Sequence, residues 1–123
     1  RAGNLLSILK NGYVIPPSNA PHVCGRAFSN GVYFSDQSTK SLNYAYGYWS
    51  GSGQKDNHCF MLLNDVAMGK YYIPPGPSNS LPKPGYDSTF AKAGKSGVIN
   101  NEMIVYNLSQ INPRYLIKFS PKR

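Results

Sequence analysis

Glu102 is the only glutamate of this chain, in which 13 lysines and arginines outnumber 5 acidic residues. It stands at the start of a short apolar segment, residues 101–106, with the sequence NEMIVY. A carboxylate held at the end of a strand can stabilise positive charge that develops on a substrate, or accept a proton from it. Glu102 is therefore the first candidate for a catalytic residue.

A second set of candidates lies almost sixty residues earlier, where GVYFSD (31–36) runs into KSLNY (40–44). Ser41 and Tyr44 are three residues apart, which places both on the same side of a helix. A hydroxyl beside a flat aromatic face suits a planar amide ligand. Together with Glu102, the pair predicts a nucleotide-cofactor site, although each residue taken alone is more often structural.

Short strands and helices must position these groups. Residues 32–34 are predicted to form a strand, followed by a helix that Asp36 or Ser38 caps and that runs to about Tyr46. Residues 3–10 predict a further short helix, residues 14–15 a small strand, and residues 102–106 and 115–119 two strands joined by a turn at 112–113. The pattern is that of a strand-rich α+β domain.

The middle of the chain gives two further expectations. Residues 59–68 begin with a continuous apolar run, which predicts a central strand buried on both faces. Residues 71–100 hold five prolines and four glycines. This composition predicts a long functional loop or flap.

Composition limits the class of protein. A chain of 123 residues forms one domain, and the net charge of +8 favours a polyanionic partner or an anionic substrate. No apolar run is long enough to cross a membrane, so the chain is expected to be soluble and intracellular, with no membrane partner. Cys24 and Cys59 are expected to be free thiols, with a disulfide as the alternative. No metal site is expected, because HxC and HC spacings are not those of structural zinc modules.

The two motifs together resemble the catalytic domain of the poly(ADP-ribose) polymerases, the diphtheria-toxin-like ADP-ribosyltransferases. The resemblance extends over nearly the whole chain, 1–123, and implies one ADP-ribosyltransferase-like domain with split antiparallel sheets and a few short helices. It also implies an enzyme that uses NAD+ as a co-substrate and transfers ADP-ribose to a protein or nucleic-acid acceptor. DNA- or RNA-linked regulation through other domains would fit this family, as would a nuclear location in a eukaryote and a cytoplasmic one otherwise.

Carried over position by position, the resemblance implies that Tyr44 stacks on the nicotinamide ring and Tyr33 lines the opposite wall. Ser41 would bond the carboxamide. Glu102 would bond a ribose hydroxyl, stabilise the charge that builds as nicotinamide leaves, and orient the acceptor.

Three other positions take roles from the same resemblance. Lys40 is expected near the acceptor and is the third catalytic candidate, with Glu102 and Tyr44. Arg1 and Asn4 are expected to contact the cofactor.

Two departures from the family pattern leave alternatives open. By this alignment the family's His-Gly strand ends just before Arg1, so the domain is expected to be truncated at its amino-terminal end. Val14 stands where many relatives have an arginine that serves the adenosine half of NAD+. The alternatives are a catalytically inactive NAD- or ADP-ribose-binding module of the same fold, and a basic nucleic-acid-binding domain.

Overall fold

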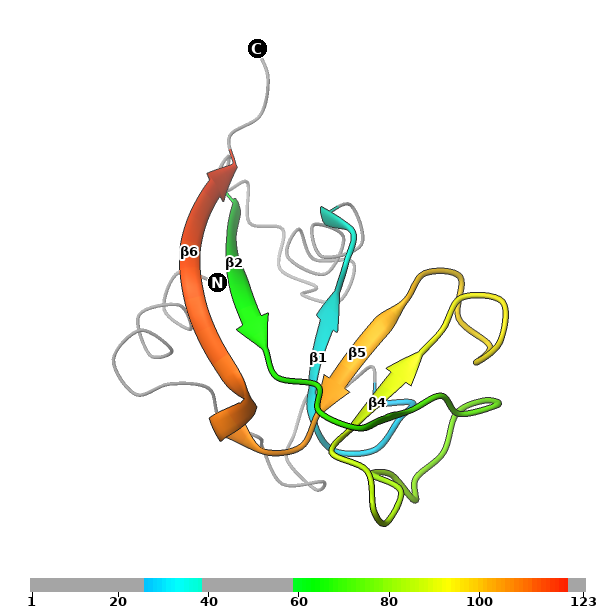
Figure 1. The fold of residues 1–123 in the computed structure, drawn as a ribbon. Coiled ribbons are helices and arrows are strands. Elements are labelled where there is room, and N and C mark those ends of the chain that lie inside the picture. The colour runs from blue at the N-terminus through cyan, green and yellow to red at the C-terminus, as the bar shows by residue number, and fades with distance from the viewer. Residues whose placement is uncertain (1–25, 39–58, 120–123) are drawn as a thin grey trace.

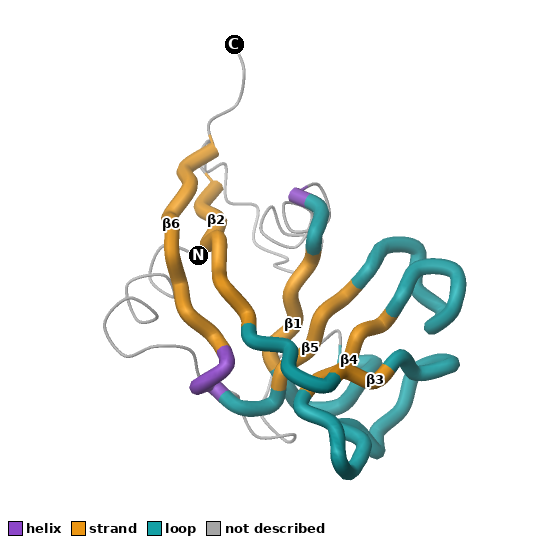
Figure 2. The backbone as a smooth tube through the Cα atoms, viewed as in Figure 1, coloured by secondary structure: helices purple, strands orange, loops and turns teal. Residues whose placement is uncertain are grey.

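A computed structural model of the chain describes residues 26–38 and 59–119. These residues form two sheets that lie beside each other and are joined by loops (Figures 1 and 2). The larger sheet has the order β1 (Val32–Ser35), β5 (Glu102–Val105), β4 (Ser88–Ala91) and β3 (Tyr71–Tyr72). The smaller sheet pairs β2 (Cys59–Val66) with β6 (Ile111–Phe119), and the short 3-10 helix η1 (Leu108–Gln110) leads into β6.

The two separate sheets, with very little helix in the described residues, confirm the α+β ADP-ribosyltransferase-like class expected from the sequence. The predicted strands at 32–34 and 102–106 are present as β1 and β5. Three of the four residues in each strand are β-branched, aromatic or other large apolar residues, which pack well on a pleated surface. The pairings β1·β5, β4·β5 and β2·β6 are antiparallel, while β3 runs parallel to β4.

β5 is one of the two inner strands of the larger sheet, paired with β1 on one side and β4 on the other. Because side chains alternate along a strand, the register divides the residues of these three strands between two faces. One face carries Tyr33, Ser35, Thr89, Ala91, Glu102 and Ile104. That face also carries the main apolar core, since Ala91 and Ile104 are fully buried there together with Phe28.

The turn before β1 is tied to this core by hydrogen bonds from several segments. The Tyr33 hydroxyl donates to the carbonyl oxygen of Ser29 at 2.7 Å and accepts from the amide of Phe28 at 2.9 Å. The Tyr106 hydroxyl donates to the carbonyl oxygen of Phe28 at 2.9 Å. The Ser29 hydroxyl donates to the carbonyl oxygen of Ser78. The turn is thereby fixed to β1, to the end of β5 and to the loop that follows β3.

The prediction of a doubly buried central strand at 59–68 is wrong. β2 pairs only with β6 among the described residues, and the Leu63 side chain is 51% exposed. A short apolar run does not by itself report how many neighbours a strand has.

The predicted turn at 112–113 is also wrong, because Asn112 and Pro113 lie within β6. Pro113 pairs with Asn64 where the register of the β2·β6 ladder shifts. An irregular position of this kind tolerates a proline, which has no amide hydrogen to donate. The chain turns instead through η1, whose amino-terminal cap is Asn107.

The segment 71–100 is only partly a loop. It contributes β3 and β4 to the larger sheet, so its proline-rich and glycine-rich parts are the connections on either side of β4. The second connection is anchored by Ser96, which is fully buried and whose hydroxyl donates to the carbonyl oxygen of Pro74.

Three expected elements lie outside the described residues: the helix at 3–10, the strand at 14–15 and the part of the next helix that follows Ser38. Cys24 also lies outside them. Cys59 is described only as the first backbone position of β2. Within the described ranges, no helix is both long and apolar enough to cross a membrane.

Gly31 brings the start of β1 into close contact with β5, which generates a prediction about stability. A methyl group placed on Gly31 would lie 2.7 Å from the Val105 carbonyl oxygen and 2.8 Å from Cγ2 of Ile104. Because the first contact is with backbone, Gly31→Ala should lower the free energy of unfolding by about 1–3 kcal/mol in urea titrations. Gly76→Ala is the control, since nothing lies within 4 Å of its added carbon. Equal stability of the two variants would show that the close contact of Gly31 with β5 does not matter.

Candidate functional site

The carboxylate candidate lies at the edge of the main core. Glu102 is the first residue of β5, where it pairs with Ser35 of β1 on one side and Ala91 of β4 on the other. It is half-buried, at the end of the sheet face that carries Ile104 and Tyr33. Glu102 therefore lies between the apolar core and the polar turns at that end of the sheet.

Tyr33 shares this face with Glu102. It pairs with Ile104, two positions along β5 from Glu102, so the two side chains are diagonal neighbours on adjacent strands. Both hydrogen-bonding functions of its hydroxyl are used by the backbone of the preceding turn. What Tyr33 can offer a ligand is therefore the edge or face of its ring.

The pKa of Tyr33 reflects this environment. Burial raises the pKa of its phenol from 10.0 to about 12, against the opposing effect of the hydrogen bond from the Phe28 amide. The negative charges of Tyr106 and Glu102 raise it further. Burial likewise raises the pKa of Tyr106, opposed by its hydrogen bond with Thr89. The phenol of Tyr33 therefore remains neutral at physiological pH.

Asn101, immediately before Glu102, makes two side-chain hydrogen bonds. Its Nδ2 donates to Oδ2 of Asp36 at 2.9 Å, and its Oδ1 accepts from the amide of Ala93 at 2.9 Å. Asp36 was expected only as a helix cap. The contact between Asn101 and Asp36 joins residues 65 positions apart. A single sequence gives no signal for such a pairing beyond the presence of both residues beside candidate site residues.

The structure brings together two of the predicted site residues, Tyr33 and Glu102. Lys40, Ser41, Tyr44, Arg1 and Asn4 lie outside the described residues, so their placement stays a prediction. Among the residues that the structure describes, no three His, Cys, Asp or Glu side chains gather as they would around a metal ion.

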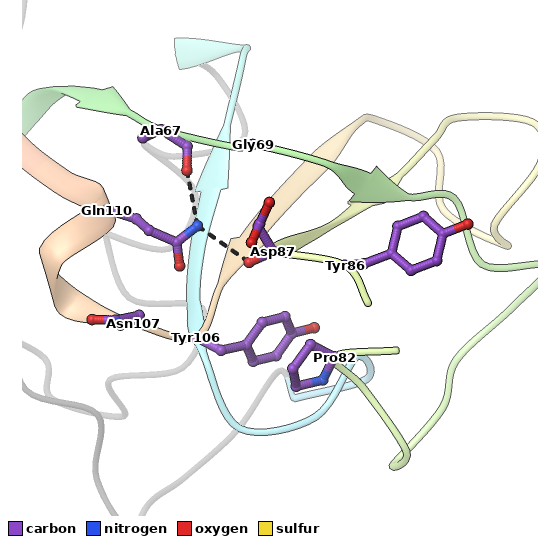
Figure 3. Close-up of a pocket in the computed structure, with 8 residues that line it drawn as sticks. All are labelled: Ala67, Gly69, Pro82, Tyr86, Asp87, Tyr106, Asn107 and Gln110. Atoms are coloured by element: carbon purple, nitrogen blue, oxygen red, sulfur yellow. Dashed lines mark hydrogen bonds between the residues drawn. The ribbon is translucent and has the colours of Figure 1, made fainter. Parts of the chain in front are cut away.

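A separate open pocket of about 470 Å³ lies near the opposite end of β5 (Figure 3). Gln110 is one of the residues that line it, and its Nε2 donates to the carbonyl oxygens of Ala67 at 2.8 Å and Asp87 at 3.2 Å. Oδ2 of Asp87 accepts from the amide of Lys70 at 2.8 Å. These polar groups hold the connections around η1 together, and the pocket is not part of the Glu102 site.

Comparison with known families gives a match over most of the chain. The family model described as the poly(ADP-ribose) polymerase catalytic domain matches residues 1–96. This range includes Tyr33, Lys40, Ser41 and Tyr44 and ends before Glu102.

Individual relatives extend the similarity past Glu102. A poly(ADP-ribose) polymerase-like protein, 100L, of Invertebrate iridescent virus 6 is 35% identical over 127 residues, covering 95% of this chain and 65% of the relative. Poly(ADP-ribose) polymerase 1 of Danio rerio is 32% identical and poly(ADP-ribose) polymerase 2 of Arabidopsis thaliana 32%, each over 96% of this chain. The chain spans only 14% and 22% of the length of these two relatives.

The raised pKa of Tyr33 predicts how stability depends on pH. Between pH 10 and 12 the unfolded chain loses the phenolic proton while the folded chain retains it, so stability should fall as the pH rises through this window. Tyr33→Phe should be less stable at neutral pH because two hydrogen bonds are lost, but its stability should fall less steeply above pH 10. Urea unfolding at a series of alkaline pH values measures both effects. Parallel pH profiles for the two proteins would contradict the assigned environment of Tyr33.

Proposed function

Because this chain belongs to the poly(ADP-ribose) polymerase catalytic-domain family, we propose that it is the catalytic domain of an NAD+-dependent ADP-ribosyltransferase. The family uses NAD+ as its substrate. In this proposal the domain occupies residues 1–123, breaks the bond between nicotinamide and ribose, and transfers ADP-ribose to a protein or nucleic-acid acceptor. Its net charge of +8 favours the approach of a substrate that carries a pyrophosphate.

The observation that best supports the proposal is the common face of Tyr33 and Glu102 on paired strands. The ring of Tyr33 and the chain's single glutamate lie on the same face of one sheet, next to a buried apolar core. The flat nicotinamide ring would need an apolar wall to pack against. The ribose, which becomes positively charged, would need a carboxylate.

Glu102 would contribute mainly through its charge. As the bond from ribose C1 to the nicotinamide nitrogen breaks, positive charge develops on the ribose, and a carboxylate bonded to a ribose hydroxyl stabilises it. The same carboxylate can orient the attacking hydroxyl of the acceptor and take up its proton. Because Glu102 is held at the start of a strand paired on both sides, its charge needs little rearrangement during the reaction.

The remaining assignments in this proposal come from the family resemblance. Tyr44 stacks on the nicotinamide ring opposite Tyr33, and Ser41 bonds the carboxamide. Lys40 lies on the acceptor side. In the sequence, the β1 strand that carries Tyr33 ends at Ser35, five residues before Lys40.

Arg1 and Asn4 contact the rest of NAD+ in the same proposal. The reaction requires no metal in this proposal, since the Glu102 carboxylate stabilises the positive charge that develops on the ribose. DNA- or RNA-linked control would come from other domains.

Glu102→Gln in the native protein should lower the rate of NAD+ cleavage by roughly 10²- to 10³-fold, because it retains the size and one acceptor oxygen of the side chain but removes the charge. The fold should be unchanged by circular dichroism. Asp65→Asn is the matched control: it removes the same charge from a side chain that is 70% exposed on the other sheet. Its rate should equal that of the parent protein.

Wild-type cleavage by Glu102→Gln would refute the catalytic role. Binding of NAD+ by the parent protein without any cleavage would instead identify the chain as a binding module of the same fold. Calorimetry with NAD+ alongside the rate measurement separates these outcomes.

A further inference from the structure

Asn101 uses both halves of its side-chain amide in described contacts. The NH2 group donates to the Asp36 carboxylate at 2.9 Å, and the oxygen accepts from the backbone amide of Ala93 at 2.9 Å. Two good hydrogen bonds on opposite sides of a planar amide fix its orientation, and the donor bond is strengthened by the negative charge of its acceptor.

The two partners come from different strands that end at the same place. Asp36 directly follows the last residue of β1, and Ala93 lies two residues beyond the last residue of β4. Asn101 directly precedes β5, which runs between these strands in the opposite direction. One side chain thus connects the ends of three adjacent strands, at the row where Glu102 pairs with both neighbours.

The turn that contains Ala93 is itself held in place by hydrogen bonds. The turn at 92–96 is closed by hydrogen bonds from the Ser96 amide to the Lys92 carbonyl oxygen at 2.9 Å and from the Lys92 amide to the Ser96 hydroxyl at 3.1 Å. Ser96 is fully buried and also bonds to the Pro74 carbonyl oxygen. Asp36, in contrast, is exposed and begins the segment that leads to Lys40 and Ser41.

Strand ends open locally more easily than strand centres, so a carboxylate on the first residue of a strand is at risk of moving. The side-chain amide of Asn101 opposes this motion. If Glu102 left its row, Asn101 would lose its hydrogen bond to Asp36, directly after β1, or to Ala93, in the turn after β4. Asparagine suits this task, since it supplies one acceptor and two donors in a single rigid plane.

We propose that Asn101 is a positioning residue, which holds the Glu102 carboxylate at a set place relative to the segment that begins at Asp36. The inference rests on the proposed function of Glu102. Asn101 itself touches no reacting group in this proposal. Its effect is to keep the carboxylate in one geometry relative to β1 and Asp36.

The test compares two asparagines at opposite ends of β5. Asn107 also makes two side-chain hydrogen bonds: its Oδ1 accepts from the amide of Ser109 at 3.0 Å and from the Ser109 hydroxyl at 2.9 Å. Asn101→Ala and Asn107→Ala should therefore cost comparable stability in urea unfolding. In the native protein, Asn101→Ala should lower kcat for NAD+ cleavage by about 10- to 10²-fold, the effect expected of a small displacement of a reacting group. KM should change much less, and Asn107→Ala should retain the parental kcat.

A rescue experiment addresses the bond to Asp36. Asp36→Ala removes the acceptor and should reproduce part of the loss of kcat. Asp36→Asn retains an oxygen acceptor and should return most of the activity. If Asn101→Ala, measured where it is fully folded, turns over NAD+ at the rate of Asn107→Ala, the positioning role is refuted.

Glu102→Gln distinguishes this failure from failure of the proposed function. A Gln variant that is inactive beside a fully active Asn101→Ala variant overturns the positioning role alone. A Gln variant with parental activity, or a parent protein that does not cleave NAD+, overturns the proposed function and the positioning role together.

Discussion

The pairing of β5 with both β1 and β4 is the constraint on which the rest of the structure depends. Ile104 and Val105 of β5 are fully buried, and the antiparallel ladders on either side fix which residues share a face. A shift of either ladder by one residue would move Tyr33 or Ala91 to the opposite face from Glu102. The core and the candidate site therefore depend on the same register.

The turn before β1 shows how that register is protected. The hydroxyls of Tyr33 and Tyr106 bond to the backbone of Phe28 and Ser29, and Gly31 allows the chain to approach β5 closely. These contacts give the part-buried hydroxyls of Tyr33 and Tyr106 hydrogen-bond partners, which avoids the cost of leaving them unsatisfied. The phenol of Tyr33 is consequently a structural group, while its ring remains beside the carboxylate of Glu102.

Local patterns in the sequence predicted some of these features and not others. The strands that carry Tyr33 and Glu102 were predictable because their apolar and aromatic residues form short runs bounded by polar ones. Three other features could not be predicted, because each depends on which strands pair: the exposed face of β2, the place of Pro113 inside β6, and the strands within 71–100. For the site, the residue types indicated Glu102 and Tyr33, but the link from Asn101 to Asp36 and Ala93 exists only through the fold.

The single glutamate offers a direct measurement of the central claim that Glu102 lies against the ribose of bound NAD+. Labelling glutamate with carbon-13 at the side-chain carboxyl gives one signal from this chain, which can be followed by NMR as NAD+ is added. If Glu102 contacts the ribose, that signal should shift saturably, with the same concentration dependence as the backbone signals of Tyr33 and its neighbours. A carboxyl signal that stays fixed while other signals report bound NAD+ would contradict that claim.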